Sequence, residues 1–213
     1  MSLAGLTIRT LLPPRCPVCR REAPDDPRAG LALCPACIGS LAVAPRGVGP
    51  PPPGLAWVAS AFRHEGLPRT ALGAFKFERR TGLAGPLADL LAARIGIRGE
   101  LGRIVPVPPS RLGGRLRGFD PAALLAGELA SRLGSEPPLI GGLVRTGRGS
   151  QRGLGRRDRL AAAGRFEAPR RLEGPVTLID DVLTTGATLT ACARAATAAG
   201  AGPVGALTLT RRR

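Results

Sequence analysis

The sequence predicts an α/β domain with a mostly parallel sheet flanked by helices, preceded by a small metal-binding module. Two observations carry this prediction. After residue 55, apolar runs alternate with helix-forming stretches, which is the pattern of parallel strands joined by crossover helices. Before that point, four of the five cysteines fall into two closely spaced pairs. A chain of 213 residues has room for one ordinary domain and a small appendage.

The paired cysteines are predicted to bind a structural zinc ion. Cys16 and Cys19 form one C-x2-C pair, and Cys34 and Cys37 form a second. Two residues between thiols allow a tight turn to direct both sulfurs at one ion, and two such turns complete the tetrahedral shell that suits Zn²⁺. A redox-active C-x2-C is the alternative, but the βαβ pattern that such a motif requires is missing here. We therefore expect residues 1–44 to form a zinc-ribbon module.

Residues 45–54 are predicted to link this module to the main domain. They are rich in proline and glycine, and they include four consecutive prolines, Pro50 to Pro53. Such a run favours an extended chain that acts as a spacer. The main domain is then expected to occupy residues 55–213.

Periodicity predicts five strands and three helices in the main domain. The strands are expected at Leu55–Phe62, Arg103–Val107, Leu139–Val144, Val176–Ile179 and Val204–Thr210. The helices are expected at Leu83–Ile97, Pro121–Leu133 and Thr188–Ala199. The second helix also has a start signal, because Asp120 is a preferred N-cap residue and Pro121 is a preferred first helical residue.

The chain is strongly basic, which favours anionic ligands. It has 31 Lys and Arg residues against 15 Asp and Glu residues, a formal net charge of +16, and a single lysine, Lys76. Such a charge suits nucleic acid or phosphorylated small molecules, although a GC-rich coding bias also produces arginine-rich chains. Aromatic residues make up only 3% of the chain, which argues against a base-stacking platform for single-stranded DNA.

The sequence lacks the patterns of membrane insertion and secretion. No apolar run approaches the ~18 residues that a membrane-spanning helix needs. The N-terminal residues continue into Pro13 and Pro14 without the small-residue site at which a signal peptide is cleaved. We therefore expect a cytoplasmic protein.

The most informative stretch runs from Val176 to Thr188. Its buried strand ends in Asp180 and Asp181, and the carboxyl edge of a parallel sheet is where α/β proteins bind ligands. The following turn, Thr184–Thr188, is small, carries hydroxyl groups and opens a helix, so its backbone N–H groups can hold an anion. A phosphate site beside two carboxylates suits a sugar phosphate whose hydroxyl groups bind the acidic pair.

This stretch resembles the motif with which type I phosphoribosyltransferases bind 5-phosphoribosyl-1-pyrophosphate (PRPP). Other motifs, in order, resemble those of the ComF family of competence-associated phosphoribosyltransferase-like proteins. They are Leu72–Arg80 with Lys76, Ile104–Arg111, Arg117–Asp120, and Arg145–Thr146 followed by Gln151, Leu154 and Arg159. A four-cysteine zinc module before the domain is also similar. The chain departs from the family at Asp120-Pro121, where Asn-Gln is usual, and at Ala161–Ala163, which replace an Asn.

The resemblance implies the type I phosphoribosyltransferase fold and a set of site residues. Asp180 and Asp181 would hold the ribose and stabilise positive charge on it, while Lys76 and Arg111 would bind the pyrophosphate. The phosphate loop would comprise Thr184, Thr185, Gly186, Ala187 and Thr188. The pyrophosphate loop would comprise Val107, Pro108, Pro109 and Ser110. Further contacts would come from Arg117, Arg145 and Gln151. Mg²⁺ would enter with PRPP. The segment Gly147–Gly164 matches a loop that closes over PRPP in related enzymes.

Three functions remain compatible with the sequence. The first is an enzyme that transfers a phosphoribosyl group from PRPP to an unknown acceptor. The second is a PRPP-sensing protein of DNA uptake, with competence proteins or single-stranded DNA as partners. The third is a zinc-ribbon module that binds nucleic acid on an inactive scaffold. Purine salvage of hypoxanthine and guanine is disfavoured, because Thr184 stands where that branch carries an acidic base.

Overall fold

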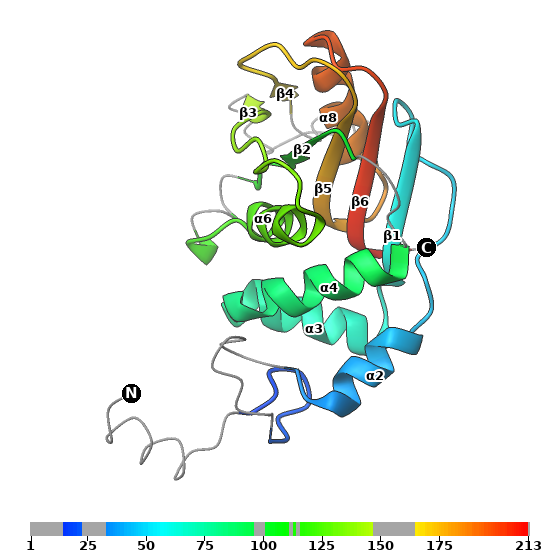
Figure 1. Cartoon of the computed structure of the whole chain (residues 1–213), viewed down its shortest axis with the longest axis vertical. Helices are drawn as coiled ribbons and strands as arrows, with labels where there is room; N and C mark the ends of the chain where they lie inside the picture. The colour runs from blue at the N-terminus through cyan, green and yellow to red at the C-terminus, as the bar shows by residue number, and fades with distance from the viewer. Residues whose placement is uncertain are drawn as a thin grey trace, which may run out of the picture.

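The centre of the protein is a four-stranded parallel sheet. The computed structural model describes residues 15–22, 33–95, 101–110, 113, 116–146 and 165–212. The strand order is β1 (Trp57–Arg63), β6 (Val204–Arg211), β5 (Val176–Leu183) and β2 (Arg103–Pro106), and every neighbouring pair is parallel (Figure 1). All four strands therefore end at the same edge of the sheet.

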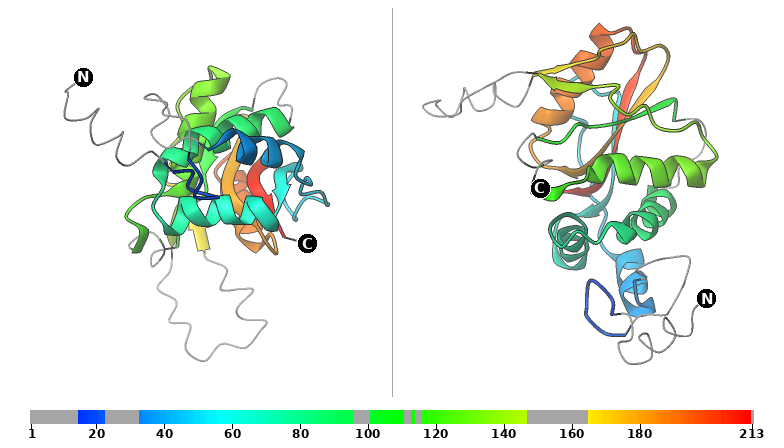
Figure 2. Two further views of the ribbon diagram at one scale, coloured as in Figure 1. Left: turned by 90° about the horizontal axis from the view of Figure 1, so that it is seen from below. Right: turned by 90° about the vertical axis from the view of Figure 1, so that its left-hand side faces the viewer.

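Helices cover both faces of this sheet, and a small hairpin lies beside it. The helices are α2 (Pro35–Val43), α3 (Gly66–Phe77), α4 (Ala84–Ile95), α6 (Pro121–Leu133) and α8 (Ala187–Ala198), with a short 3-10 turn at Thr81–Leu83. Strands β3 (Val144–Thr146) and β4 (Arg165–Glu167) pair in antiparallel fashion. Figure 2 shows α8 on one side of the sheet and α4 and α6 on the other. No helix among the described residues is long and apolar enough to cross a membrane.

Strand β5 explains why the sheet is buried on both faces. Its residues 176–179 form a continuous apolar and threonine run, as expected for a central strand of a parallel sheet. Leu178 packs in one core with Leu189 of α8, and Ile179 packs in the other core with Leu125 of α6. The sequence-based prediction of an α/β domain with a mostly parallel sheet is confirmed at this level.

The cysteine module shares a hydrophobic core with the helices of the main domain. Leu41 of α2 is fully buried in the same cluster as Phe75 of α3 and Leu87 of α4. Arg94 of α4 reinforces this contact, because its guanidinium donates to the carbonyl groups of Ala42 and Ala44 at the end of α2. The module therefore packs against the domain along α3 and α4 (Figure 1).

The proline-rich segment predicted to be a linker lies along the sheet. The Arg63 N–H group donates to the Pro45 carbonyl, and Gly47 forms an antiparallel bridge with Ser60 of β1. Farther on, Pro52 is buried beside Gly186, at the beginning of α8. This segment therefore packs against β1 and reaches from the cysteine module to the turn before α8.

The structure differs from the prediction of local structure in one wrong strand, in two helices that were not predicted, and in the length of β5. A strand at Leu139–Val144 is wrong, because Gly141 adopts a positive φ of 73° and turns the chain, so that only Val144 enters a strand. Helices α2 and α3 were not predicted. In α3, Pro68 occupies the first turn and obscures the apolar face formed by Leu72 and Phe75. Strand β5 is also longer than predicted: it continues past the acidic pair to Leu183 because it keeps pairing with β6.

Candidate functional site

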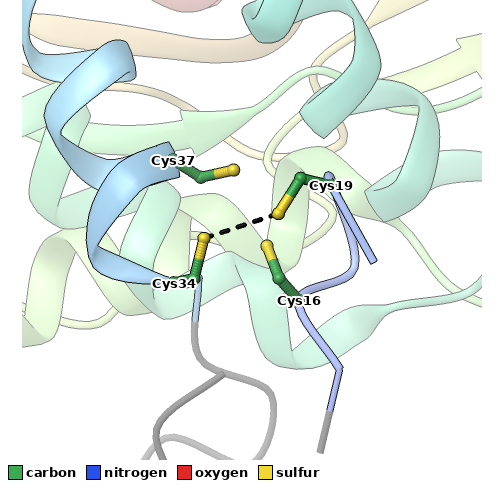
Figure 3. Close-up of side chains that lie close together, drawn as sticks. All are labelled: Cys16, Cys19, Cys34 and Cys37. Atoms are coloured by element: carbon green, nitrogen blue, oxygen red, sulfur yellow. Dashed lines mark hydrogen bonds between the residues drawn. The ribbon is translucent and has the colours of Figure 1, made fainter. Parts of the chain in front are cut away.

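The four paired cysteines lie close enough together to hold a metal ion. Their Sγ atoms all lie within 4.8 Å of one another and point toward a common centre (Figure 3). Zn–S bonds of about 2.3 Å place the sulfurs of a tetrahedral site about 3.8 Å apart, and the Cys19 and Cys34 sulfurs are separated by 3.5 Å. The set of ligands and its geometry therefore fit zinc. The complete shell of four sulfurs is typical of a structural rather than a catalytic ion.

Local backbone structure directs the sulfurs inward. In the first pair, the turn closes when the Arg20 N–H group donates to the Cys16 carbonyl, and Arg20 then takes a left-handed φ of 65°. In the second pair, Cys34 caps α2 and Cys37 lies in its first turn, where Pro35 is a favoured starting residue. Burial opposes ionisation of the Cys16 thiol, but nearby backbone hydrogen bonds lower its pKa to about 6.

A second site lies at the carboxyl edge of the sheet, between β5 and β2. A cavity of about 280 Å³ opens there. It is lined by many of the residues that the family resemblance implies, namely Lys76, Val107, Pro108, Pro109, Ser110, Arg117, Arg145, Asp180, Asp181 and Thr188. Segments far apart in the sequence therefore meet around one cavity, because β2 and β5 are neighbours and α3 packs on the same side.

The acidic pair and Lys76 form the centre of this cavity. Lys76 Nζ lies 2.8 Å from Asp181 Oδ2, and the two side chains are only 17% and 13% exposed. Asp180 accepts a hydrogen bond from the Asp181 N–H group. Burial raises the pKa of Asp180 to about 8, and the negative charge of Asp181 acts in the same direction. Lys76 therefore places a basic group directly beside the acidic pair.

Two arginines line the cavity with unused donors. The Nε atoms of Arg117 and Arg145 are buried and have no hydrogen-bond partner among the described residues. The guanidinium of Arg145 lies 4.5 Å from the ring centroid of Phe166, which holds it in place by a cation–π contact. A buried donor without a partner is costly. The cavity therefore brings two arginine side chains to the same space as the acidic pair.

The predicted phosphate loop forms the beginning of α8. Gly186 caps the helix with a positive φ of 80°, and a Cβ atom there would lie 2.7 Å from Pro52 Cγ, so both conformation and space require glycine. The Ala187 N–H group makes only a long hydrogen bond, 3.4 Å, to Thr185 Oγ1. Thr188 lines the cavity, whereas Thr184, Thr185, Gly186 and Ala187 precede it without lining it.

Asp120 is a residue of the cavity that sequence reasoning took only for a helix cap. It does cap α6, since its Oδ1 accepts from the N–H groups of Ala122 and Ala123. It also lines the cavity, and burial raises its pKa despite those hydrogen bonds. Its place directly after the Arg-Gly-Phe motif was the signal that could have revealed this second role. Arg111, Gln151 and the segment Gly147–Gly164 lie outside the described residues.

Comparison with known proteins identifies no relative. No protein-family model matches the chain, and no curated protein sequence matches it significantly. The class of the protein is therefore described by its own three features. It is an α/β protein with a parallel sheet, it has a cavity at the carboxyl edge that is lined by both acidic and basic side chains, and it has a four-cysteine cluster suited to zinc.

Proposed function

We propose that the chain is a PRPP-binding, phosphoribosyltransferase-like protein of the ComF type, with a structural zinc ion. The observation that carries the proposal is the composition of the cavity at the sheet edge. Two adjacent carboxylates face Lys76, Arg117 and Arg145 across one cavity, and a glycine-containing turn at a helix N-terminus adjoins it. PRPP needs all three elements, because it combines ribose hydroxyl groups, a 5′-phosphate and a pyrophosphate.

Each group of residues has a distinct role in this proposal. The carboxylates of Asp180 and Asp181 would accept hydrogen bonds from the ribose hydroxyl groups and stabilise the positive charge that develops at C1 as pyrophosphate departs. The backbone N–H groups of Thr185–Thr188 would hold the 5′-phosphate. Arg117 and Lys76 would bind the pyrophosphate, which an Mg²⁺ ion bound with PRPP helps to neutralise. Lys76 must then exchange some of its contact with Asp181 for the ligand.

The cellular setting follows from the family resemblance. Members of the ComF family are associated with competence, so we place this chain in the cytoplasm, in DNA uptake or nucleotide metabolism. Proteins of the uptake machinery are its expected partners. Whether it transfers the phosphoribosyl group or only senses PRPP is decided by assaying PRPP turnover with candidate acceptors.

Calorimetry with PRPP and Mg²⁺ tests the proposal. We expect the native chain to bind, and the variant Asp180→Asn/Asp181→Asn to lose affinity by about 100-fold or more, because the change removes the negative charge with which the acidic pair binds the ribose hydroxyl groups. The matched control is Asp89→Asn/Glu136→Gln, which removes two exposed carboxylates away from the cavity. Absence of binding by the native chain, or equal loss in the control, would refute PRPP binding.

A second candidate function is binding of single-stranded DNA by the zinc module. The observation that favours it is a set of exposed arginines, Arg15, Arg20 and Arg21, around the cysteine cluster. Contacts with phosphates release counterions, so affinity for an oligonucleotide should fall steeply with salt concentration. The variant Arg15→Gln/Arg21→Gln should bind more weakly and show a shallower slope. A salt-insensitive signal would exclude this function.

A further inference from the structure

A groove lined by arginines lies at the same edge of the sheet as the candidate PRPP cavity. It consists of two neighbouring cavities of about 340 and 240 Å³, which share Arg63, Arg211 and Arg212. Arg69 of α3 lines the larger one, and Arg46 lines the smaller one. We call the space bounded by these five residues the basic groove.

Cations dominate this groove. Glu65 is the one acidic residue that lines it, and it pairs with Arg63 at 3.3 Å. Among the described residues, no carboxylate pairs with the other four arginines of the groove. Burial and then the charge of Arg46 also lower the pKa of nearby Arg94. Positive charges held close together attract anions, and the repulsion between them is reduced when an anion binds.

Hydrogen bonds connect the groove to the acidic pair. His64 lines the groove, and its Nδ1 lies 2.9 Å from the hydroxyl of Thr210, a fully buried residue of β6. The same hydroxyl donates to the main-chain carbonyl of Asp181. Burial and the charges of Arg212 and Arg69 lower the pKa of His64, so the ring is neutral at pH 7.

The fold also places the groove beside the cavity. Strand β6, which ends at Arg211, is the direct neighbour of β5, and β1, which ends at Arg63, lies on the far side of β6. Helix α3 contributes Arg69 to the groove and, about two turns later, Lys76 to the cavity. The basic groove and the candidate PRPP cavity are therefore both lined by residues of α3 and by residues at the carboxyl edge of the sheet.

We propose that the basic groove binds the anionic group, a phosphate or a carboxylate, of a small second substrate or effector that acts together with PRPP. This statement rests on the proposed function. Guanidinium groups bind both kinds of anion through paired hydrogen bonds. The volumes suit a small molecule. No Phe, Tyr or Trp side chain among the described residues lines the groove, so it lacks the large aromatic rings on which the bases of a nucleic acid usually stack.

The single histidine of the chain makes the groove directly observable. In the untagged full-length protein, the ring resonances of His64 report on the groove, and the variant Asp180→Asn/Asp181→Asn separates this signal from any effect that reaches the ring from the acidic pair. We expect inorganic phosphate or succinate to shift them saturably, and the preferred probe identifies which anion the groove takes. The shift should persist in the variant Asp180→Asn/Asp181→Asn and when Mg²⁺ and PRPP are present, so this test does not depend on PRPP binding.

Variants that remove arginine charges then test whether the anionic probe binds in the basic groove. The variant Arg69→Gln/Arg212→Gln should weaken binding of the probe about tenfold or more, whereas Arg170→Gln/Arg171→Gln, with the same loss of charge away from the groove, should not. The proposal is overturned if neither anion gives a saturable shift, if PRPP abolishes it, or if both variants weaken it equally. Saturation by an oligodeoxynucleotide alone would also overturn it, in favour of a nucleic-acid surface.

Discussion

At the residue scale, the most unusual group is the carboxyl of Asp180. Its pKa is raised from 3.8 to about 8, first by burial and then by the charge of Asp181. A carboxyl whose pKa is raised on folding binds its proton more tightly in the native state than in the unfolded state. Its contribution therefore favours the native state at low pH and is lost as the pH rises between those two values.

This sign leads to a prediction for Asp180→Asn. Relative to the native chain, the variant should gain free energy of unfolding between pH 5 and pH 9, by an amount on the order of a few kcal/mol. Urea denaturation at both pH values measures it. The exposed Asp89→Asn change provides the control, and its difference from the native chain should stay constant. Parallel pH profiles for Asp180→Asn and the native chain would show that Asp180 titrates normally.

Residues of the site differ in how well the sequence predicted them. Asp180 and Asp181 were predicted because they lie within one short motif that combines strand, turn and helix signals. Asp120 was assigned only a capping role, because its approach to the cavity depends on how α6 packs against β5. The basic groove was not predicted at all. Arg46, Arg69 and Arg212 come from three distant segments, and only the strand order brings them together.

At the element scale, the junction of β5 and α8 depends on a single glycine. Gly186 has a positive φ, and its Cα lies close to Pro52 of the extended segment that precedes β1. The turn that presents N–H groups to a phosphate is therefore supported by a residue more than a hundred positions earlier. A side chain at position 186 would strain the backbone and displace this support.

We predict opposite effects for two glycine-to-alanine changes. Gly186→Ala should lower the free energy of unfolding by about 1–3 kcal/mol and weaken binding of PRPP. Gly127→Ala should raise the free energy of unfolding by about 0.5–1 kcal/mol, because Gly127 lies inside α6 and a Cβ there meets nothing within 4 Å. Chemical denaturation measures both. Similar values for the two variants would contradict the role of the loop conformation.

The elements that the sequence predicted well are those with a clear signal of their own. Helix α6 begins and ends where expected, because Asp120 and Pro121 start it and Gly134, with a φ of 61°, ends it. The predictions failed where tertiary contacts decide. Leu139 pairs with Ile104 through one hydrogen bond and then turns at Gly141, so an apolar run that resembles a strand lies beside β2 without joining the sheet.

At the scale of the whole molecule, the zinc module and the main domain share interactions that reach toward the candidate site. Arg20, next to the first cysteine pair, forms an ion pair of 2.6 Å with Glu78, which follows α3 directly. Helix α3 carries Lys76, the partner of Asp181. The cysteine module is therefore one support of the helix that holds Lys76.

We predict that the chain contains one zinc ion and that its removal destabilises the whole protein. Elemental analysis should find zinc in the native chain and none in Cys16→Ser/Cys34→Ser, with a lower melting temperature of the single unfolding transition. The control is Cys192→Ala, which changes a buried thiol outside the cluster and should retain the metal. A zinc-free variant whose main domain melts at the native temperature would show that the module is independent.

The central claim is that the cavity between β5 and β2 binds PRPP, and a crystal structure of the chain with PRPP and Mg²⁺ tests it most directly. We predict the 5′-phosphate at the N–H groups of Thr185–Thr188, the ribose hydroxyl groups at Asp180 and Asp181, and the pyrophosphate facing Arg117. The claim would be contradicted by crystals grown at saturating PRPP in which this cavity holds no ligand, or in which PRPP occupies the basic groove instead.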